Sequence, residues 1–197
     1  LYVRAVEGTI RALGDYQTDN RGDVGSWVRE AAMGAALALL KGSAAAAEAD
    51  LAAGTAAGTP SSLAPPAACS DEWTALRSAV PSLCQSLVRG LCQQVNEKID
   101  RVRELAASTL VALLASALPR PAHHHKLRVI FRSGDAVADT ADCFLRPHSC
   151  FPLTARLLAL NAYRRDALRG IVTSAGGMSE STLRAADAAM RGVIGTM

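Results

Sequence analysis

Apolar side chains recur every three or four positions through most of the chain, which is the spacing of one face of an α-helix. Two such stripes fall within residues 1–41. The first comprises Val3, Val6, Ile10 and Leu13. The second comprises Val24, Val28, Ala31, Ala35 and Leu39. Asp23 precedes the second stripe, and its carboxylate suits the free N–H groups of a first helical turn. Residues 1–41 are therefore predicted to form a pair of helices.

A second pair of stripes lies within residues 70–118. The first of these comprises Trp73, Leu76, Val80, Leu83, Leu87 and Leu91. The second comprises Ile99, Val102, Ala106, Leu110 and Leu113. Pro81 lies inside the first stripe, where a missing N–H group and a steric clash are expected to kink the helix.

An acidic residue five positions before a Val-Arg pair occurs in both helix pairs. Asp23 precedes Val28-Arg29, and Glu97 precedes Val102-Arg103. This pattern resembles the second helix of a HEAT-type repeat, in which arginines often pair with acids of the neighbouring unit. A weaker third copy contains Leu183-Arg184. The predicted fold is therefore all-α, a HEAT/armadillo-like α-solenoid of stacked antiparallel helix pairs. Val28 and Val102 lie 74 residues apart, more than the usual period of about 40–47 residues, so we expect insertions.

The segments between the stripes differ in composition. Residues 42–69 are mostly Ala, Gly, Ser, Thr and Pro, and we expect a low-complexity flexible insertion there. The helix before it is expected to end at Gly42, and Ser70 is expected to cap the helix after it. Residues 119–150 show little periodicity and are expected to be an irregular connector. Within it, residues 127–131 alternate weakly and suit a strand or a short helix, and an irregular or helical structure is favoured. Residues 151–197 are predicted to form a C-terminal helix pair, whose last helix is capped by Ser179 or Ser181. Pro152 is expected to open the first helical stretch of this segment, and Gly176-Gly177 is expected to form a helix-terminating turn. The 197 residues begin at Leu1, and we interpret the whole as one solenoid fragment of a larger protein.

Composition and charge narrow the function classes. The chain is 50% hydrophobic but only 4% aromatic, which favours packed helices over a β-sandwich. No apolar run reaches the 18 or so residues of a membrane span, and the five cysteines form no CxxC pair, which favours reduced thiols in a cytosolic protein. The net charge is +3, with basic and acidic residues interleaved, so nucleic acid is not the expected partner.

The largest local basic excess lies in residues 151–197, with six basic and three acidic side chains. Arg165 and Arg169 are four positions apart, so they share a face of one predicted helix. The candidate partner surface comprises Arg164, Arg165, Arg169, Arg184 and Trp27. Two alternatives stay open, because the arginines also suit a solvated basic face and Trp27 also suits the core.

No motif in the sequence predicts catalysis or metal binding. Three adjacent histidines, His123 to His125, point in different directions and rarely bind a metal without distant ligands. His148 and Cys150 lie in the predicted connector, which would position a catalytic pair poorly. We therefore expect no catalytic residue, no metal and no cofactor, and we interpret the chain as an interaction scaffold rather than an enzyme.

Three blocks of the sequence resemble the C-terminal region of the tubulin-folding cofactor D family. The first spans 15–33 and reads DYQTDNRGDVGSWVREAAM. The second spans 93–103 and continues through Ala106-Ala107-Ser108, and the third comprises Tyr163-Arg164 and 176–184. Residues 42–69 and the connector depart from the family pattern.

This resemblance implies a cytosolic, microtubule-associated chaperone. It implies binding to β-tubulin and action with cofactors C and E in assembly of the α/β-tubulin heterodimer. It also implies stimulation of tubulin GTP hydrolysis together with cofactor C, and binding to an Arf-like small GTPase. Tubulin is strongly acidic, so a basic surface is expected to face it. The alternative is a generic HEAT-repeat adaptor for other protein partners.

Overall fold

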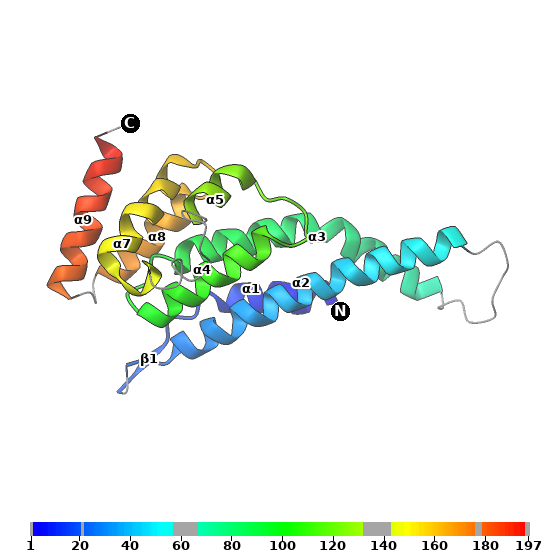
Figure 1. The fold of residues 1–197 in the computed structure, drawn as a ribbon. Coiled ribbons are helices and arrows are strands. Elements are labelled where there is room, and N and C mark those ends of the chain that lie inside the picture. Colours follow the sequence, from blue (N-terminus) through cyan, green and yellow to red (C-terminus); the bar gives the residue numbers. More distant parts are fainter. Residues whose placement is uncertain (1, 21, 57–66, 132–142, 176–178, 196–197) are drawn as a thin grey trace.

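The structure is a computed structural model that describes residues 2–20, 22–56, 67–131, 143–175 and 179–195. This part of the chain is helical apart from turns and one short antiparallel hairpin, formed by β1 (Thr18–Asp19) and β2 (Gly22–Asp23). The helical elements are α1 (Tyr2–Ala12), α2 (Gly25–Ala56), α3 (Ala67–Gln94), α4 (Asp100–Leu114), α5 (His124–Phe131), α7 (Pro147–Thr154), the 3₁₀-helix η1 (Ala155–Ala159), α8 (Arg164–Ala175) and α9 (Glu180–Ile194) (Figure 1). The predicted all-α class is confirmed.

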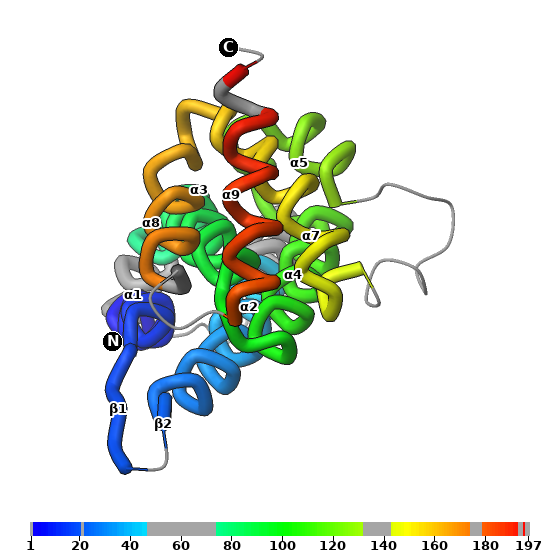
Figure 2. The backbone as a smooth tube through the Cα atoms, turned by 90° about the vertical axis from the view of Figure 1, so that its left-hand side faces the viewer, coloured from blue at the N-terminus to red at the C-terminus, as the bar shows by residue number. Residues whose placement is uncertain are grey.

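The helices stack side by side, and several that are distant in the chain are neighbours in space. α3 packs against both α1 and α8, whereas α4 packs against α2 and α5. α9 packs against α7 and η1 and lies at the outer edge of the described structure (Figure 1). The β1–β2 hairpin projects from the body beside the start of α2 (Figure 2). Stacked antiparallel helices of this kind are what the predicted α-solenoid requires.

The buried face of α4 matches the predicted stripe. Val102, Ala106, Leu110 and Leu113 are all buried, and they join a single core cluster with the apolar face of α3. That core extends from Val6 in α1 to Ala186 in α9. Continuous burial along the stack is the expected basis of its stability.

The prediction of which side chains of α2 are buried is wrong, because the buried positions lie about one residue along from the predicted ones. Val28, Ala31 and Ala35 are exposed. Among residues 25–46 of this helix, the buried side chains are instead Ser26, Arg29, Ala32, Met33, Ala36, Leu40 and Ser43. The physical reason is that Arg29 points inward to acidic partners described below, and this rotates the helix relative to a purely apolar stripe.

Two helix boundaries also differ from expectation. Gly42 does not end α2, which continues to Ala56. α3 begins at Ala67 rather than at Ser70, and Pro81 lies inside it. Residues 57–66, the centre of the expected insertion, lie outside the described residues, so its flexibility stays a prediction.

The expected connector contains regular structure. Residues 127–131 belong to α5, so the helical alternative is confirmed and the strand alternative is wrong. Pro152 does not open the next helix, because α7 begins at Pro147. The turn expected at Gly176-Gly177 lies outside the described residues. No helix in the described part of the chain is long and apolar enough to cross a membrane.

Candidate functional site

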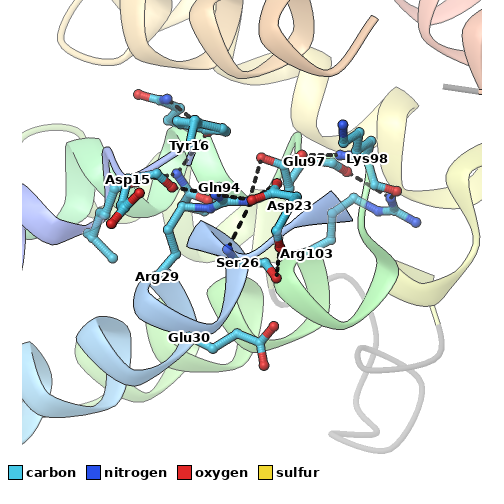
Figure 3. Close-up of polar contacts among 12 residues, drawn as sticks. Asp15, Tyr16, Asp23, Ser26, Arg29, Glu30, Gln94, Glu97, Lys98 and Arg103 are labelled. Atoms are coloured by element: carbon cyan, nitrogen blue, oxygen red, sulfur yellow. Dashed lines mark hydrogen bonds and ion pairs between the residues drawn. The ribbon is translucent and has the colours of Figure 1, made fainter. Parts of the chain in front are cut away.

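A buried arginine at the start of α2 is the centre of a polar network (Figure 3). The Arg29 side chain has 0% exposure, and its Nη2 donates to Asp23 Oδ2 at 2.9 Å and to Glu97 Oε2 at 3.4 Å. The guanidinium also donates to the carbonyl oxygen of Asp15 and lies 4.2 Å from the centre of the Tyr16 ring. Arg29 therefore joins the hairpin, α2 and the turn before α4. This agrees with the prediction that such an arginine pairs with an acid of the neighbouring unit.

Asp23 has two roles in this network. Its Oδ1 accepts a hydrogen bond from the Ser26 backbone N–H at 3.1 Å, so it caps α2 as predicted. Burial alone raises the pKa of this carboxyl, but the hydrogen bonds and positive charge of Arg29 outweigh burial and lower the pKa below its usual value. Asp23 is therefore ionised at neutral pH and forms a charged pair with Arg29.

A second arginine occupies the equivalent place in α4. Arg103 is also fully buried, and its Nη1 donates to the carbonyl oxygen of Glu97 at 2.7 Å. Its Nε donates to the carbonyl oxygen of Phe144 at 3.1 Å, across to the segment that leads into α7. The acidic partner of Arg103 is Asp100, whose Oδ1 lies 2.5 Å from Arg103 Nη2, whereas the Glu97 carboxylate pairs with Arg29. Each arginine thus connects its helix to the next part of the stack.

The loop before the hairpin is tied to the end of α3 by amide side chains. Gln94 Nε2 donates to the carbonyl oxygen of Leu13 at 2.9 Å, and Gln93 Nε2 donates to the Tyr16 hydroxyl at 3.0 Å. Burial raises the pKa of Tyr16, and the negative charge of Glu97 adds to that rise. The network consists of ion pairs and hydrogen bonds that join different helices, together with a neutral tyrosine, although Arg29 Nε and Gln94 Oε1 are buried without a hydrogen-bond partner among the described residues. This arrangement positions the helices relative to one another.

The basic side chains proposed as a partner surface are divided between two helices. Arg164, Arg165 and Arg169 all lie on α8 and are exposed. Arg164 Nε donates to the carbonyl oxygen of Leu158 at 2.7 Å. Arg165 and Arg169 have no acidic partner in the described part of the chain. Arg184 lies on α9, where it forms an ion pair with Glu180 and is exposed, unlike Arg29 and Arg103.

Trp27 lies apart from these arginines, at the start of α2. Its side chain is 56% exposed, so it does not belong to the core. It lines an open apolar groove of about 520 Å³ between α1 and α2. The groove is lined by Gly8, Thr9, Ala12, Trp27, Val28, Ala31, Ala32 and Ala35.

The histidines and cysteines do not assemble into a site. His123 Nε2 lies 2.5 Å from Asn161 Oδ1, whereas His124 Nε2 lies 3.2 Å from the carbonyl oxygen of Leu114. Among the described residues, no group of three or more potential metal ligands converges. Burial raises the pKa of the Cys150 thiol to about 11, so it is protonated at neutral pH and poorly nucleophilic.

The family of the chain follows from its C-terminal part. A family model described as tubulin folding cofactor D C terminal matches residues 85–195, more than half of the chain. The chain belongs to this family. The matched part of this cofactor D chain contains Glu97, Arg103 and the basic helix α8, whereas Arg29 and Trp27 lie before it. No solved structure matches the cofactor D chain described here.

Sequence reasoning predicted the pairing of Arg29 with a neighbouring unit, which the structure shows. The partner surface on α8 stays a prediction, although its arginines are exposed as such a surface requires. Sequence reasoning missed the exposure of Leu168 and Val172, which lie beside Arg165 and Arg169 on α8. Apolar residues at helical spacing give no signal that separates a buried face from an exposed one.

Proposed function

We propose that this chain is the C-terminal helical scaffold of a tubulin-folding cofactor and that the exposed face of α8 contacts the acidic partner. The family match supports the general role. The single observation that supports this particular face is that Arg165 and Arg169 lie one turn apart on α8, exposed and without acidic partners among the described residues. Two unpaired cations on a preformed helix favour attraction to an acidic protein.

The proposed partner is β-tubulin, either alone or bound to cofactors C and E. In this proposal the chain acts in the cytoplasm during assembly of the α/β-tubulin heterodimer, and it contributes to the stimulation of tubulin GTP hydrolysis together with cofactor C. Binding of the larger protein to an Arf-like small GTPase belongs to the same proposal. The chain itself acts as a chaperone scaffold and provides no catalytic residue.

The test is charge reversal at the two arginines. We expect Arg165→Glu with Arg169→Glu to weaken association with purified tubulin at least about tenfold, which corresponds to about 1.4 kcal/mol. The wild-type interaction should also weaken with added salt, because exposed charges are screened over about 8 Å at physiological ionic strength. Surface plasmon resonance at two salt concentrations measures both effects.

A matched control reverses the charges of Arg4 and Arg11 by substitution with Glu. Both side chains are exposed on α1, which packs against α3 as α8 does but is a separate helix from the proposed surface. This control changes net charge equally and should retain binding. Equal binding by the α8 variant and the wild type at low salt would refute the proposed surface.

A further inference from the structure

The outer face of α8 combines positive charge with exposed apolar side chains. Arg165 and Arg169 are four positions apart, as are Leu168 and Val172, and each arginine lies three positions before one of the apolar residues, so the four side chains share one face of the helix. Leu168 is 44% exposed and Val172 is 63% exposed, whereas their neighbours Ala167 and Ile171 are buried. The face is therefore amphipathic in its own right, with a charged row beside an apolar row.

The acid on this helix does not neutralise the charged row. Asp166 Oδ2 accepts a hydrogen bond from Arg89 Nε of α3 at 2.8 Å, which turns the carboxylate toward the body of the protein. The acids of α9 are likewise used within their own helix, where Glu180 pairs with Arg184 and Asp187 pairs with Arg191. The positive charge of Arg165 and Arg169 is consequently available to an external acid.

α8 is held firmly enough to present this face without rearrangement. Ala167 and Ile171 are buried on its inner side. Gly170 meets the C-terminal end of α3 so closely that a Cβ atom would overlap the carbonyl oxygen of Gln93. The Asp166–Arg89 ion pair adds a second attachment to α3. A preformed surface loses little conformational entropy when a partner binds.

We propose that the outer face of α8 is a docking site for an acidic amphipathic helix of a partner protein. Acidic side chains one turn apart on that helix would pair with Arg165 and Arg169, and an adjacent apolar row would cover Leu168 and Val172. This inference rests on the proposed function, since it takes the acidic partner of α8 and specifies its local structure.

A helix fits this face better than the other possible ligands. An extended segment normally binds through backbone hydrogen bonds to a sheet edge, and the outer face of a helix offers no such edge. A helix satisfies its own backbone and presents only side chains. Nucleic acid would place phosphates against Leu168 and Val172, and the face has no aromatic ring on which a base would stack.

The test uses the complete chain and two fluorescein-labelled peptides of 18 or so residues, a length sufficient for several helical turns. One peptide is a designed Glu/Leu amphipathic helix, and the other has the same composition in scrambled order. We expect the amphipathic peptide to bind the wild type at least about tenfold more tightly than the scrambled peptide, measured by fluorescence anisotropy.

Two variants separate the charged row from the apolar row. Leu168→Ser with Val172→Ser should reduce binding of the amphipathic peptide to the level of the scrambled one, while Arg165→Glu with Arg169→Glu should abolish binding of both. Val129→Ser, an exposed apolar residue on α5, is the matched control and should have no effect. All these side chains are exposed, so the melting temperatures should stay unchanged.

Three results would overturn the inference. These are equal affinity of the wild type for the two peptides, full peptide binding by Leu168→Ser with Val172→Ser, and tighter binding to phosphatidylserine vesicles than to the amphipathic peptide.

Tubulin provides the separate test of the proposed function. If tubulin binding requires the arginines but not Leu168 and Val172, this inference fails and the proposed function stands. If the amphipathic peptide binds as expected and tubulin does not, the proposed function fails and this inference stands.

Discussion

At the scale of single residues, buried arginines determine how this chain folds. Arg29 has a charged pair with Asp23 in its own helix pair and a second contact with Glu97 in the next. An arginine in this position is stable only because each charge has hydrogen-bonded partners. The exposed pair between Arg101 and Glu30, whose atoms Nε and Oε1 are 2.7 Å apart, also links α4 to α2 but in a solvated setting.

The buried Arg29 and the exposed Arg101 allow a matched test of how much burial of an ion pair contributes to stability. Arg29→Met removes a buried cation and leaves two carboxylates without their partner, so we expect a loss of about 3–5 kcal/mol in the free energy of unfolding. Arg101→Met breaks an exposed ion pair, for which the expected loss is about 0–1 kcal/mol. Urea unfolding followed by circular dichroism measures both. Similar losses in the two variants would contradict the structural role assigned to Arg29.

At the scale of the helices, equivalent positions of the repeated pattern have different environments. Val28 and Val102 each precede the buried arginine of their helix. Val102 has 0% exposure within the core cluster, on a helix that packs against α2, α3 and α5, whereas Val28 is 41% exposed beside the groove between α1 and α2. The same sequence pattern therefore predicts burial correctly in one helix and wrongly in the other.

A pair of identical substitutions tests this difference. Val102→Asp places an unpaired charge in the core, and we expect it to lower the free energy of unfolding by at least about 3 kcal/mol. Val28→Asp places the charge on an exposed position in the first turn of α2, where a negative charge is tolerated, and should change it by less than about 1 kcal/mol. Thermal melts of both variants give the comparison, and a severe loss in Val28→Asp would show that the assigned face of α2 is wrong.

The third copy of the pattern shows why the sequence predicted the fold better than the site. Stripes of apolar residues predicted the helices because helical periodicity is local. The buried arginines have partners in other segments of the chain, since Arg29 donates to Glu97 and Arg103 donates to the carbonyl oxygen of Phe144, whereas Arg184 pairs with Glu180 of its own helix. Arg184 is correspondingly exposed. The exposure of Leu168 and Val172 depends on which helices pack against α8, and no local pattern contains that information.

At the scale of the whole molecule, packing is uneven along the stack. α3 contacts α1, α2, α4 and α8, whereas α9 packs mainly against α7 and η1. Among the described side chains of α9, Ala186 is the one that is fully buried. A helix with so little buried area adds little to the cooperative core.

This gradient predicts the order of local opening. We expect the backbone amides of α9 to exchange with solvent faster than those of α3 and α4, because opening α9 disrupts few buried contacts. Hydrogen–deuterium exchange with mass spectrometry measures the three helices in one experiment. Protection of α9 equal to that of α4 would mean that α9 is part of the same cooperative unit.

The network around Arg29 has a consequence for inherited or laboratory variants of this protein. A substitution there lowers the fraction of folded molecules, and cells remove unfolded chains through chaperones and proteases. Its effect should therefore be a reduced amount of protein with ordinary affinity per surviving molecule. A substitution at Arg165 or Arg169 should give the opposite result, a normal amount of protein with weakened binding. Measuring abundance beside affinity would thus sort variants by the part of the molecule that they affect.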